Sequence, residues 1–449
     1  MNIARLIEKM ELHSEKDAII FDDKIYTYGD LLSKIDLWGK RIEESRIESG
    51  KVVSIAGDYS PDAIALIIAL IRNKDIIVPL GLSAESHLSE YYQISRSQYV
   101  IDLLSGNYNV LEQKAEPQEN TILRDLIKNQ HPGLILFTSG STGKPKAVAH
   151  DFDKLLSKYA DADKSYRTLC FLLFDHIAGI DTYFYCLFSG GTAIYPTSRN
   201  PAYVCDLIER YNVEVLPTSP TFLNLLLISE EYKRHDLSTL KIITFGSERM
   251  HKELLDRLKD AFPGVRLVQK YGVTELGSPP SKTRGDDSTW IKMDSERFRV
   301  KVMDDILYVK ADTAMLGYLN ATSPFTEDGW FNTGDSVEVD GDYLRILGRK
   351  SEIINVGGEK VYPAEVEGVI LEFENVEDVT VYGEKNVILG EIVCAKVSLL
   401  QDEDPNEFVK QLKKYCKSKL ENYKIPVKVN VTDEKLHSVR YKKNRQIVS

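Results

Sequence analysis

The first 270 residues alternate between short apolar stretches and longer stretches with a helical pattern, and this alternation constrains the fold more than any other feature. Strands are expected at 52–56, 76–79, 213–216, 241–245 and 265–268, and helices at 61–72, 222–227 and 251–262. Pro61 suits the first turn of its helix, because that position needs no backbone N–H. Strands that alternate with helices form α/β layers, so we expect largely parallel sheets covered by helices.

The pattern changes after residue 300. Residues 300–309 and 336–346 favour antiparallel β structure, and Asp340-Gly341 between apolar segments is a strong hairpin signal. The last hundred or so residues combine strands at 379–382 and 392–397 with a helix at 406–420. A chain of 449 residues is too long for one ordinary hydrophobic core, so more than one domain is expected. We place the domain boundary near Arg349, where the last hundred or so residues begin. We expect a large N-terminal domain of parallel α/β layers with a β subdomain at 1–348, and a small α+β domain at 349–449.

Charge, hydropathy and cysteine usage exclude several classes of protein. The net charge of −11 argues against nucleic acid as a ligand, because such binding rests on neutralising phosphates. The longest apolar run, 63–71, is far short of the ~20 residues that span a bilayer, so we expect no membrane span. The first nine residues carry charges and lack a signal-peptide core. The five scattered cysteines lack metal-ligand spacing, which predicts reduced core thiols and a cytoplasmic location.

The strongest local motif is a segment rich in glycine and hydroxyl residues. An apolar stretch at 134–137 leads directly into Thr138-Ser139-Gly140-Ser141-Thr142-Gly143-Lys144-Pro145-Lys146. Glycines let backbone N–H groups crowd around an anion, while hydroxyls and lysines add donors and positive charge. The pattern predicts a phosphate-binding loop. It is not a Walker A loop, because that motif requires a glycine at the position of Thr138 and a hydroxyl residue at the position of Pro145.

This segment resembles the signature of the adenylate-forming superfamily, which contains acyl-CoA synthetases, adenylation domains of peptide synthetases and beetle luciferases. Further stretches resemble the family in the same order, over 137–443. They are Phe174-Asp175-His176-Ile177-Ala178-Gly179, Phe245-Gly246-Ser247-Glu248, Tyr271-Gly272-Val273-Thr274-Glu275, Met315-Leu316-Gly317-Tyr318, Gly329-Trp330-Phe331-Asn332-Thr333-Gly334-Asp335, and 347–363. The resemblance implies that residues 349–449 form a mobile lid over the N-terminal domain.

For ATP, the resemblance implies a binding site assembled from these motifs. The loop Thr138 to Gly143 and Lys146 would hold the phosphates. Thr274 would donate its hydroxyl to the α-phosphate, and Glu275 would hold Mg²⁺ as a hard oxygen ligand. The remaining nucleotide contacts that the resemblance implies are Gly246, Ser247 and Glu248 along the adenine, Tyr271 stacked on it beside Gly272, and Asp335 and Arg349 on the ribose hydroxyls.

For the acid and the thiol, the resemblance implies a second group of residues. His176 would lie beside the entry for the carboxylate, although a lone histidine is often structural. The loop around Gly357 and Gly358 would reach the thiol tunnel after the lid rotates, and its form is nearer to that of acyl-CoA synthetases than to that of peptide synthetases. Phe174, Phe184, Phe222 and residues 271–280 are candidates for the acid pocket, but aromatic residues are more often core.

The C-terminal tail departs from the family pattern, which normally ends in Gly-Lys-x-x-Arg with the lysine bridging the carboxylate and the α-phosphate. Counting back from Arg445 places this lysine at Lys442, with Tyr441 in place of the glycine, whereas counting forward from Leu436 favours Lys443. Both remain candidates, with Lys442 preferred. From residue 401 to the end, twelve Lys and Arg stand against seven Asp and Glu, a net charge of +5. This is either a solvated basic surface or a docking face for an acidic partner.

Three functions are compatible with these features. The first is an acid–CoA ligase, which uses ATP to convert a carboxylic acid to an acyl-adenylate with release of pyrophosphate and then passes the acyl group to coenzyme A. The second is a stand-alone enzyme that loads the phosphopantetheine of an acyl carrier protein, whose acidic helix would suit the basic tail. The third is a nucleotide-binding module without catalysis, against which Lys146, Glu275, Asp335 and Arg349 argue. We expect the first, with the acid itself undefined.

Overall fold

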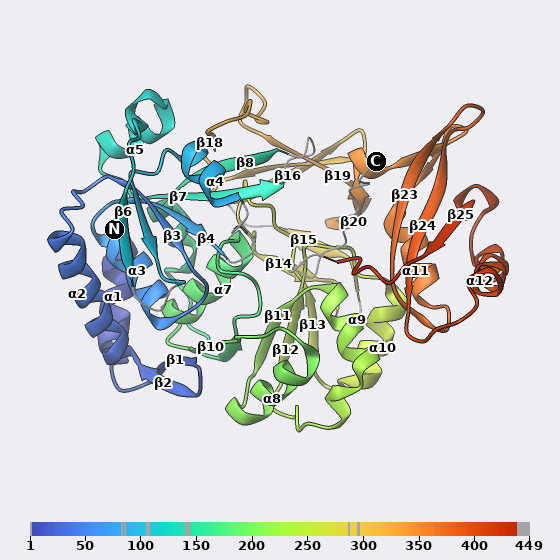
Figure 1. Cartoon of the computed structure of the whole chain (residues 1–449), viewed down its shortest axis with the longest axis horizontal. Helices are drawn as coiled ribbons and strands as arrows, with labels where there is room; N and C mark the ends of the chain where they lie inside the picture. The colour runs from blue at the N-terminus through green and yellow to red at the C-terminus, as the bar shows by residue number, and fades with distance from the viewer. Residues whose placement is uncertain are drawn as a thin grey trace.

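The computed structural model of the chain describes residues 2–81, 84, 87–104, 108–139, 144–285, 288–293 and 297–437. An α/β body contains the N-terminal and central parts of the chain, and the C-terminal residues form a lobe at one end of it (Figure 1). No helix in these described ranges is long and apolar enough to cross a membrane.

The first sheet of the body has the strand order β13-β12-β11-β9-β10-β1-β2 and is parallel except where β2 joins it. Its strands are β1 (Asp17–Phe21), β2 (Lys24–Thr27), β9 (Arg167–Leu169), β10 (Thr192–Tyr195), β11 (Val215–Thr218), β12 (Ile242–Phe245) and β13 (Arg266–Gln269). Three helices pack on one face through a common apolar cluster, α8 (Pro201–Tyr211), α9 (Pro220–Ser229) and α10 (Lys252–Ala261).

The second sheet has the order β18-β8-β7-β4-β3-β5-β6, with parallel pairing from β7 to β5. Its strands are β3 (Val52–Ala56), β4 (Ile76–Leu80), β5 (Tyr99–Asp102), β6 (Asn109–Glu112), β7 (Gly133–Ser139), β8 (Pro145–Asp151) and β18 (Gly317–Tyr318). Strands β7 and β8 are antiparallel and flank the expected phosphate loop.

The largest apolar core lies between these two sheets and is filled by helices from both. The helices of this core are α1 (Asn2–Leu12), α2 (Tyr28–Glu44), α3 (Pro61–Arg72), α6 (Phe152–Leu156) and α7 (Ile177–Phe188). Helices α4 (Leu88–Ser95) and α5 (Thr121–Asn129) belong to a separate apolar cluster on the other face of the second sheet. Helix α3 begins as predicted, because the Ser60 side chain accepts a hydrogen bond from the N–H of Ala63 and Pro61 occupies the first turn. It is apolar almost all round and is therefore buried.

The third sheet is antiparallel and has the order β14-β15-β20-β19-β17-β16. Its strands are β14 (Ser281–Thr283), β15 (Ile291–Met293), β16 (Phe298–Met303), β17 (Ile306–Ala311), β19 (Phe331–Asp340) and β20 (Tyr343–Arg349). The expected hairpin is confirmed: Asp340 pairs with Tyr343, and Gly341 takes the positive φ of +58° that such a tight turn requires.

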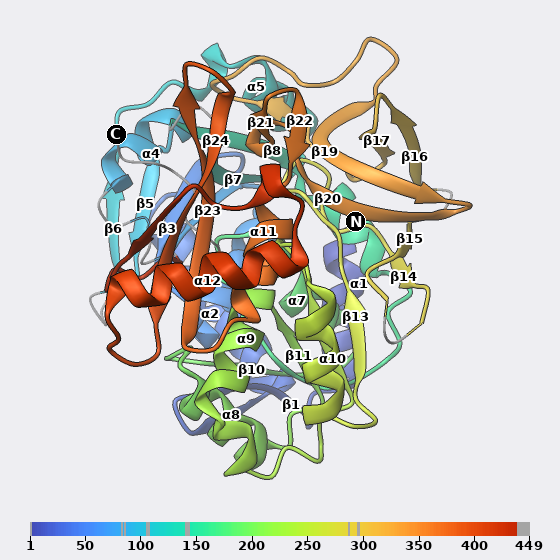
Figure 2. The ribbon, with the colours of Figure 1, turned by 90° about the vertical axis from the view of Figure 1, so that its right-hand side faces the viewer.

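The C-terminal lobe has its own sheet and its own apolar core. Its elements are β21 (Ile354–Val356), β22 (Glu359–Val361), α11 (Pro363–Leu371), β23 (Val376–Asn386), β24 (Gly390–Leu399), α12 (Pro405–Lys419) and β25 (Lys428–Val431). Strand β24 is central, with β23, β21 and β25 as partners. Helix α12 crosses the sheet (Figure 2) and packs onto it through Phe408, Leu412 and Cys416.

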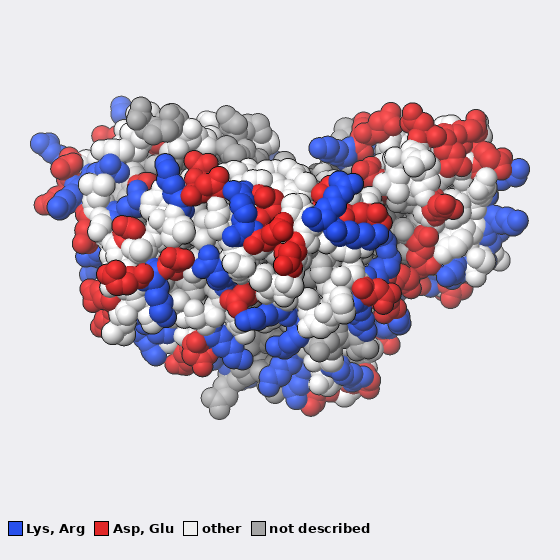
Figure 3. Space-filling view, turned by 90° about the horizontal axis from the view of Figure 1, so that it is seen from below, with Lys and Arg blue, Asp and Glu red and all other residues white. Residues whose placement is uncertain are grey.

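The lobe touches the body through α9 and α10, which face α11 and β23. The Asn224 side-chain amide donates to the carbonyl of Glu377 over 3.4 Å. Helix α11 comes close to His251 because residue 368 is glycine: a Cβ there would lie 2.3 Å from His251 Nδ1. A notch separates the lobe from the body on one face (Figure 3). The five cysteines are buried and form no disulfide, as expected.

Candidate active site

Three of the predicted nucleotide-contacting residues meet around one carboxylate. Asp335 and Arg349 are cross-strand partners at the open end of the β19–β20 hairpin, and Tyr271 comes from the turn after β13. The Tyr271 hydroxyl donates to Asp335 Oδ2 over 2.7 Å, and Arg349 Nε lies 3.1 Å from Asp335 Oδ1. Asp335 is only 6% exposed, and desolvation raises its pKa although Arg349 and Tyr271 both favour the charged form.

This geometry fixes the ring of Tyr271. The ring belongs to the apolar core of the third sheet, and its hydroxyl is bound to Asp335. Each carboxylate oxygen of Asp335 accepts one contact from the protein and keeps lone-pair capacity for a further donor. Residues from the β19–β20 hairpin and from the turn after β13 thus form a preorganised group. The guanidinium at its edge is exposed, because the Arg349 side chain is 54% exposed.

A second group links Lys146, on β8 after the predicted phosphate loop, to the turn at 271–277. The Tyr318 hydroxyl donates to Glu275 Oε1 over 2.6 Å, and the ammonium of Lys146 lies 5.2 Å from the centroid of the Tyr318 ring. Tyr318 reaches this place because β18 pairs with β8, two residues after Lys146. An ammonium, a carboxylate and the nearby hydroxyl residue Thr274 are donors and acceptors that suit a phosphate chain with Mg²⁺. Tyr318 was part of a recognised motif, but its link to Glu275 was not predicted.

His150 contacts the same turn from β8. Its contact was not predicted from the sequence. Its Nε2 is 2.8 Å from the carbonyl oxygen of Thr274, which can only accept, so Nε2 carries the proton. The side chain is fully buried on β8, and desolvation lowers its pKa to about 4. The histidine is therefore neutral and connects the strand after the phosphate loop to the Thr274–Glu275 turn. No local signal in the sequence marks this contact, because the two residues are 124 positions apart.

The stretch Gly246-Ser247-Glu248 follows β12 at the carboxyl end of the parallel sheet. A Cβ at Gly246 would lie 2.7 Å from the carbonyl oxygen of Lys270, so the strand ends approach each other only because of this glycine. Ser247 has a φ of +67°, a left-handed conformation that is strained for serine and is often found at functional sites. Glu248 accepts a 2.6 Å hydrogen bond from the Thr221 hydroxyl, near the N-terminus of α9.

His176 lies at the N-terminus of α7, where Asp175 and Gly179 fix the backbone around it. Asp175 Oδ2 accepts from the N–H of Gly81 over 3.1 Å, and its other oxygen lies 3.7 Å from His176 Nε2. A Cβ at Gly179 would sit 1.9 Å from the carbonyl oxygen of Leu173, so only glycine fits there. Among the aromatic candidates for the acid pocket, Phe174, Phe184 and Phe222 are fully buried members of the core clusters.

Polar groups nearer the centre of the body were not predicted. Lys158 forms a largely buried ion pair with Asp181 of α7, and the Tyr159 hydroxyl donates to the same carboxylate. Lys270, directly before Tyr271, is accessible to solvent. These residues lie outside the recognised motifs, and only a three-dimensional arrangement brings them together.

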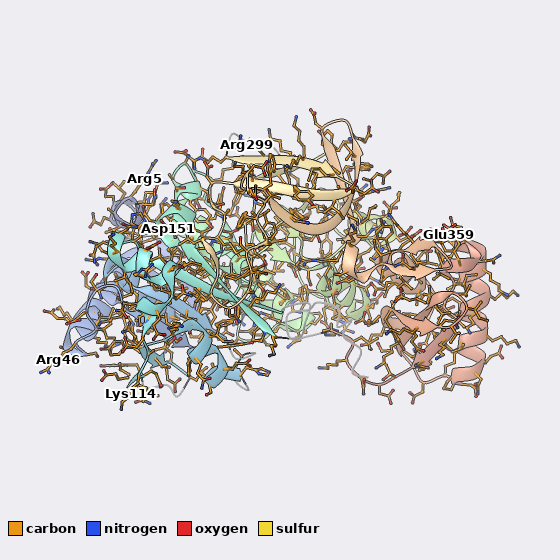
Figure 4. The ribbon with its side chains drawn as sticks, turned by 90° about the horizontal axis from the view of Figure 1, so that it is seen from above. Arg5, Arg46, Lys114, Asp151, Arg299 and Glu359 are labelled. Carbon is orange, nitrogen blue, oxygen red and sulfur yellow. The ribbon has the colours of Figure 1, made fainter. Side chains whose placement is uncertain are left out.

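The expected thiol loop is the turn of the β21–β22 hairpin. Gly357 and Gly358 are its central residues, with φ values of +61° and +97°, so the hairpin depends on two positive-φ positions. The turn is exposed, and the Gly357 N–H donates to the carbonyl of Leu389 over 2.8 Å. Glu359, which follows the turn, lies on the C-terminal lobe, well apart from Asp151 at the end of β8 (Figure 4).

Some predicted residues lie outside the described part of the chain. They are Gly140, Ser141, Thr142 and Gly143 of the phosphate loop and the tail lysines Lys442 and Lys443. Ser139 is described for its backbone only, at the end of β7, and Thr138 pairs with Lys146 across β7 and β8. Gly272 lies in the compact turn before Thr274, where a Cβ would be 2.9 Å from Ser278 Oγ.

Comparison with known protein families shows to which family the chain belongs. The model for AMP-binding enzymes matches residues 6–296, and the model for the C-terminal domain of AMP-binding enzymes matches residues 365–443. The chain belongs to the AMP-binding enzyme family. The motifs that suggested the adenylate-forming superfamily are therefore those of a true member.

Relatives of this AMP-binding enzyme align along nearly its whole length. A 2-succinylbenzoate–CoA ligase of Geobacillus sp. (strain WCH70) is 27% identical over 96% of the chain and 93% of the relative. An indoleacetate–CoA ligase of Aromatoleum aromaticum is 27% identical over 98% and 96%. The crystal structure of the anthranilate–CoA ligase AuaEII with anthranoyl-AMP matches with a TM-score of 0.84 at 20% identity, covering 98% of the chain and 95% of that protein. This structural match confirms the expected α/β fold with a large N-terminal and a smaller C-terminal part.

Proposed function

We propose that this AMP-binding enzyme is an acid–CoA ligase, which activates a carboxylic acid with ATP and transfers the acyl group to coenzyme A. The observation that carries the proposal is the joining of Lys146, Tyr318 and Glu275 beside the Thr274 turn, in a family member whose full-length relatives are CoA ligases. The group lies on the same 271–277 turn as Tyr271, the partner of Asp335.

In the first half-reaction, a carboxylate oxygen of the acid forms a bond to the α-phosphorus of ATP, and the bond to the pyrophosphate oxygen breaks. Lys146 and the Thr274 hydroxyl are placed to stabilise the negative charge that develops on the phosphates. Glu275 would hold Mg²⁺, which supplies further positive charge there. Tyr318 and His150 keep Glu275 and Thr274 in position, and no side chain needs to act as a nucleophile.

The nucleoside would lie along the carboxyl ends of the first sheet. Asp335 accepts hydrogen bonds from the ribose hydroxyls, with Arg349 as the second ribose contact. The adenine lies along Gly246-Ser247-Glu248, and Tyr271 provides the stacking surface. Ligands of open α/β sheets bind at this edge, which supports the assignment.

In the second half-reaction, residues 349–449 rotate as a lid about the hinge that follows Arg349. Rotation carries the Gly357–Gly358 turn to the thiol tunnel and removes Lys442 or Lys443 from the α-phosphate. His176, at the start of α7, borders the carboxylate entry. The thiol sulfur then forms a bond to the acyl carbon, and AMP leaves.

A second acceptor is favoured by one observation. Helix α12 carries lysines at 410, 413, 414, 417 and 419, and several of them are exposed on the outer face of the lobe. An acidic helix of an acyl carrier protein would complement this face. Its phosphopantetheine thiol would then replace coenzyme A in the second half-reaction.

The test is exchange of labelled pyrophosphate into ATP across fatty, aryl and amino acids, followed by thioester formation with coenzyme A or a loaded carrier protein. We expect exchange only when a suitable acid is present, and AMP and pyrophosphate as products. Formation of ADP and phosphate would overturn the proposal. Nucleotide binding without pyrophosphate release would instead indicate a module that has lost catalysis.

A further inference from the structure

Lys270 occupies an unusual place for a lysine. It directly follows β13 and is held to the end of β12 by a hydrogen bond from its N–H to the carbonyl of Phe245. Its side chain is accessible to solvent, yet the protein around it desolvates the ammonium enough to lower its pKa. Nearby protein atoms disfavour the charged form of a lysine, so the Lys270 ammonium is partly surrounded by protein although solvent reaches the side chain.

The strand register shows on which face of the sheet Lys270 lies. Thr244 is the cross-strand partner of Val268, and Phe245 is the partner of Gln269, so Gly246 stands beside Lys270. Phe245 and Leu267 belong to the core that α8, α9 and α10 cover. Side chains alternate between the two faces of a sheet, so the intervening positions face the opposite side, away from those helices. Gly246 allows the Lys270 backbone to approach closely, because a Cβ at Gly246 would lie 2.7 Å from the Lys270 carbonyl oxygen.

The charged side chains near Lys270 do not neutralise its ammonium group. Among charged side chains, Asp181 of α7 acts on it most strongly, followed by Arg266 and Lys158. Asp181 is already bound by Lys158 and by the Tyr159 hydroxyl. Within the described ranges, no carboxylate lies within ion-pairing distance of the Lys270 ammonium. A desolvated cation without a counter-ion is costly, and a bound anion removes that cost.

We propose that Lys270 binds a second carboxylate of the acid substrate, so that this enzyme selects dicarboxylic acids. The inference rests on the proposed function, because it takes the reacting carboxylate to lie at Thr274 and Glu275. Lys270 lies four residues before Thr274, so their backbones are at most about 14 Å apart. This separation suits a compact acid with both carboxylates on one short skeleton.

The experiment compares acids that differ only in the second carboxylate. Dicarboxylic acids of four to eight carbons are each paired with the monocarboxylic acid of equal carbon number, and phthalate is paired with benzoate. Pyrophosphate exchange gives kcat/KM for each acid and KM for ATP, in the wild type and in Lys270→Met, Lys270→Arg and Lys128→Met. Lys128 is an exposed lysine on α5 and serves as the matched control.

The wild type is expected to prefer one diacid over its monoacid partner. Lys270→Met should lower kcat/KM for that diacid about tenfold to hundredfold, the range for a lost charged hydrogen bond, and leave the monoacid and ATP unchanged. Lys270→Arg should recover part of the selectivity, and Lys128→Met should have no effect.

Two results would overturn the inference while leaving the proposed function intact. One is a wild type that uses monoacids as well as diacids. The other is an equal loss for both acids, or a raised KM for ATP, in Lys270→Met, which would place the lysine at the phosphates or in the scaffold. Absence of exchange with every acid would instead count against the proposed function itself.

Discussion

The body and the lobe each contribute a predicted functional segment, and the two segments are supported in opposite ways. Asp335 is buried and bound by both Tyr271 and Arg349, whereas the Gly357–Gly358 turn is exposed at the end of a short hairpin. Gly246 of the body and Gly358 of the lobe are also required for different reasons. A Cβ at Gly246 would collide with backbone, whereas a Cβ at Gly358 would meet no atom within 4 Å among the described residues, so the positive φ alone requires glycine there.

The contrast indicates that the two segments have different functional requirements. The Asp335 group is held by contacts that exist before any ligand binds, and in the proposed function this lowers the cost of ordering it during the reaction. The Gly357–Gly358 turn is exposed, and in the proposed function it changes position when the lobe rotates. The following variants separate the two sides.

The largest effect is expected from the tail lysine. If Lys442 bridges the forming anhydride, Lys442→Ala should slow adenylation about 10²- to 10³-fold, since a lost preorganised charge costs roughly 3 to 4 kcal/mol. Thioester formation from a supplied acyl-adenylate should be nearly unchanged, because the lid has then rotated. Single-turnover assays of each half-reaction measure both rates. Normal adenylation in Lys442→Ala would move the role to Lys443, and normal rates in the double variant would mean that the tail does not close over the site.

The next effect concerns the histidine that holds the body's turn. The pKa of His150 is about 4 in the folded protein and near 6.5 in the unfolded chain, so between these values the unfolded state binds the extra proton. Its contribution to stability is therefore present above pH 6.5 and falls toward pH 4, by about 3 kcal/mol in all. His150→Asn keeps an N–H donor but cannot titrate. Its melting temperature should depend less on pH between 7 and 4.5 than that of the wild type.

The exposed His87 offers a matched control for this measurement. His87→Asn should melt with the same pH dependence as the wild type. Equal pH dependence in the wild type and His150→Asn would show that protonation of His150 does not limit the stability of the turn.

A smaller effect is expected at the ribose carboxylate. Asp335→Ala should weaken ATP binding by about 1 to 3 kcal/mol, or roughly five- to 150-fold, because charged hydrogen bonds to the ligand are lost. Titration calorimetry measures the affinity, and circular dichroism checks the fold. Asp335→Asn preserves the shape and should lie between the wild type and the alanine variant. Unchanged affinity in both variants would refute the ribose role.

The smallest effect is expected at the lobe's turn. Gly358→Ala places a side chain at a φ of +97° and should cost about 1 to 2 kcal/mol of backbone strain. Thioester formation should slow roughly five- to thirtyfold, while pyrophosphate exchange stays normal. A loss of exchange would show that the turn also serves adenylation, and would remove the division between body and lobe.

Much of the fold is local and was therefore predictable from the sequence. The helix expected at 61–72 has these bounds because its cap, its first-turn proline and its apolar run are adjacent in the chain. The strand expected at 213–216 begins two residues later, at Val215. Val213 instead closes α8: Asn212 is left-handed, and the Val213 N–H donates to the carbonyl of Ile208. An apolar residue can serve a helix cap as well as a strand, and composition does not distinguish the two.

In the candidate site, too, features that are local in the sequence could be predicted and contacts between distant residues could not. The positions of Asp335 and Arg349 could be recognised because each sits in a contiguous motif. The bond from Tyr318 to Glu275 and the bond from His150 to Thr274 could not, because their partners are 43 and 124 residues apart and meet only through strand pairing. The position of the Lys270 side chain likewise depends on which face of β13 is directed toward α7, and a short parallel strand does not encode that choice.

The pairing of Asp335 with Arg349 also determines where the protein can be divided. These residues are register partners at the last step of the β19–β20 ladder, and the chain passes to the lobe immediately afterwards. A chimera joined after Arg349 would thus inherit the proposed ribose contacts, Asp335 and Arg349, from one parent and its entire C-terminal lobe from the other. We expect that exchange of C-terminal lobes among relatives at this junction changes acceptor preference and retains nucleotide affinity. Residue 350 is therefore a suitable junction for chimeric proteins.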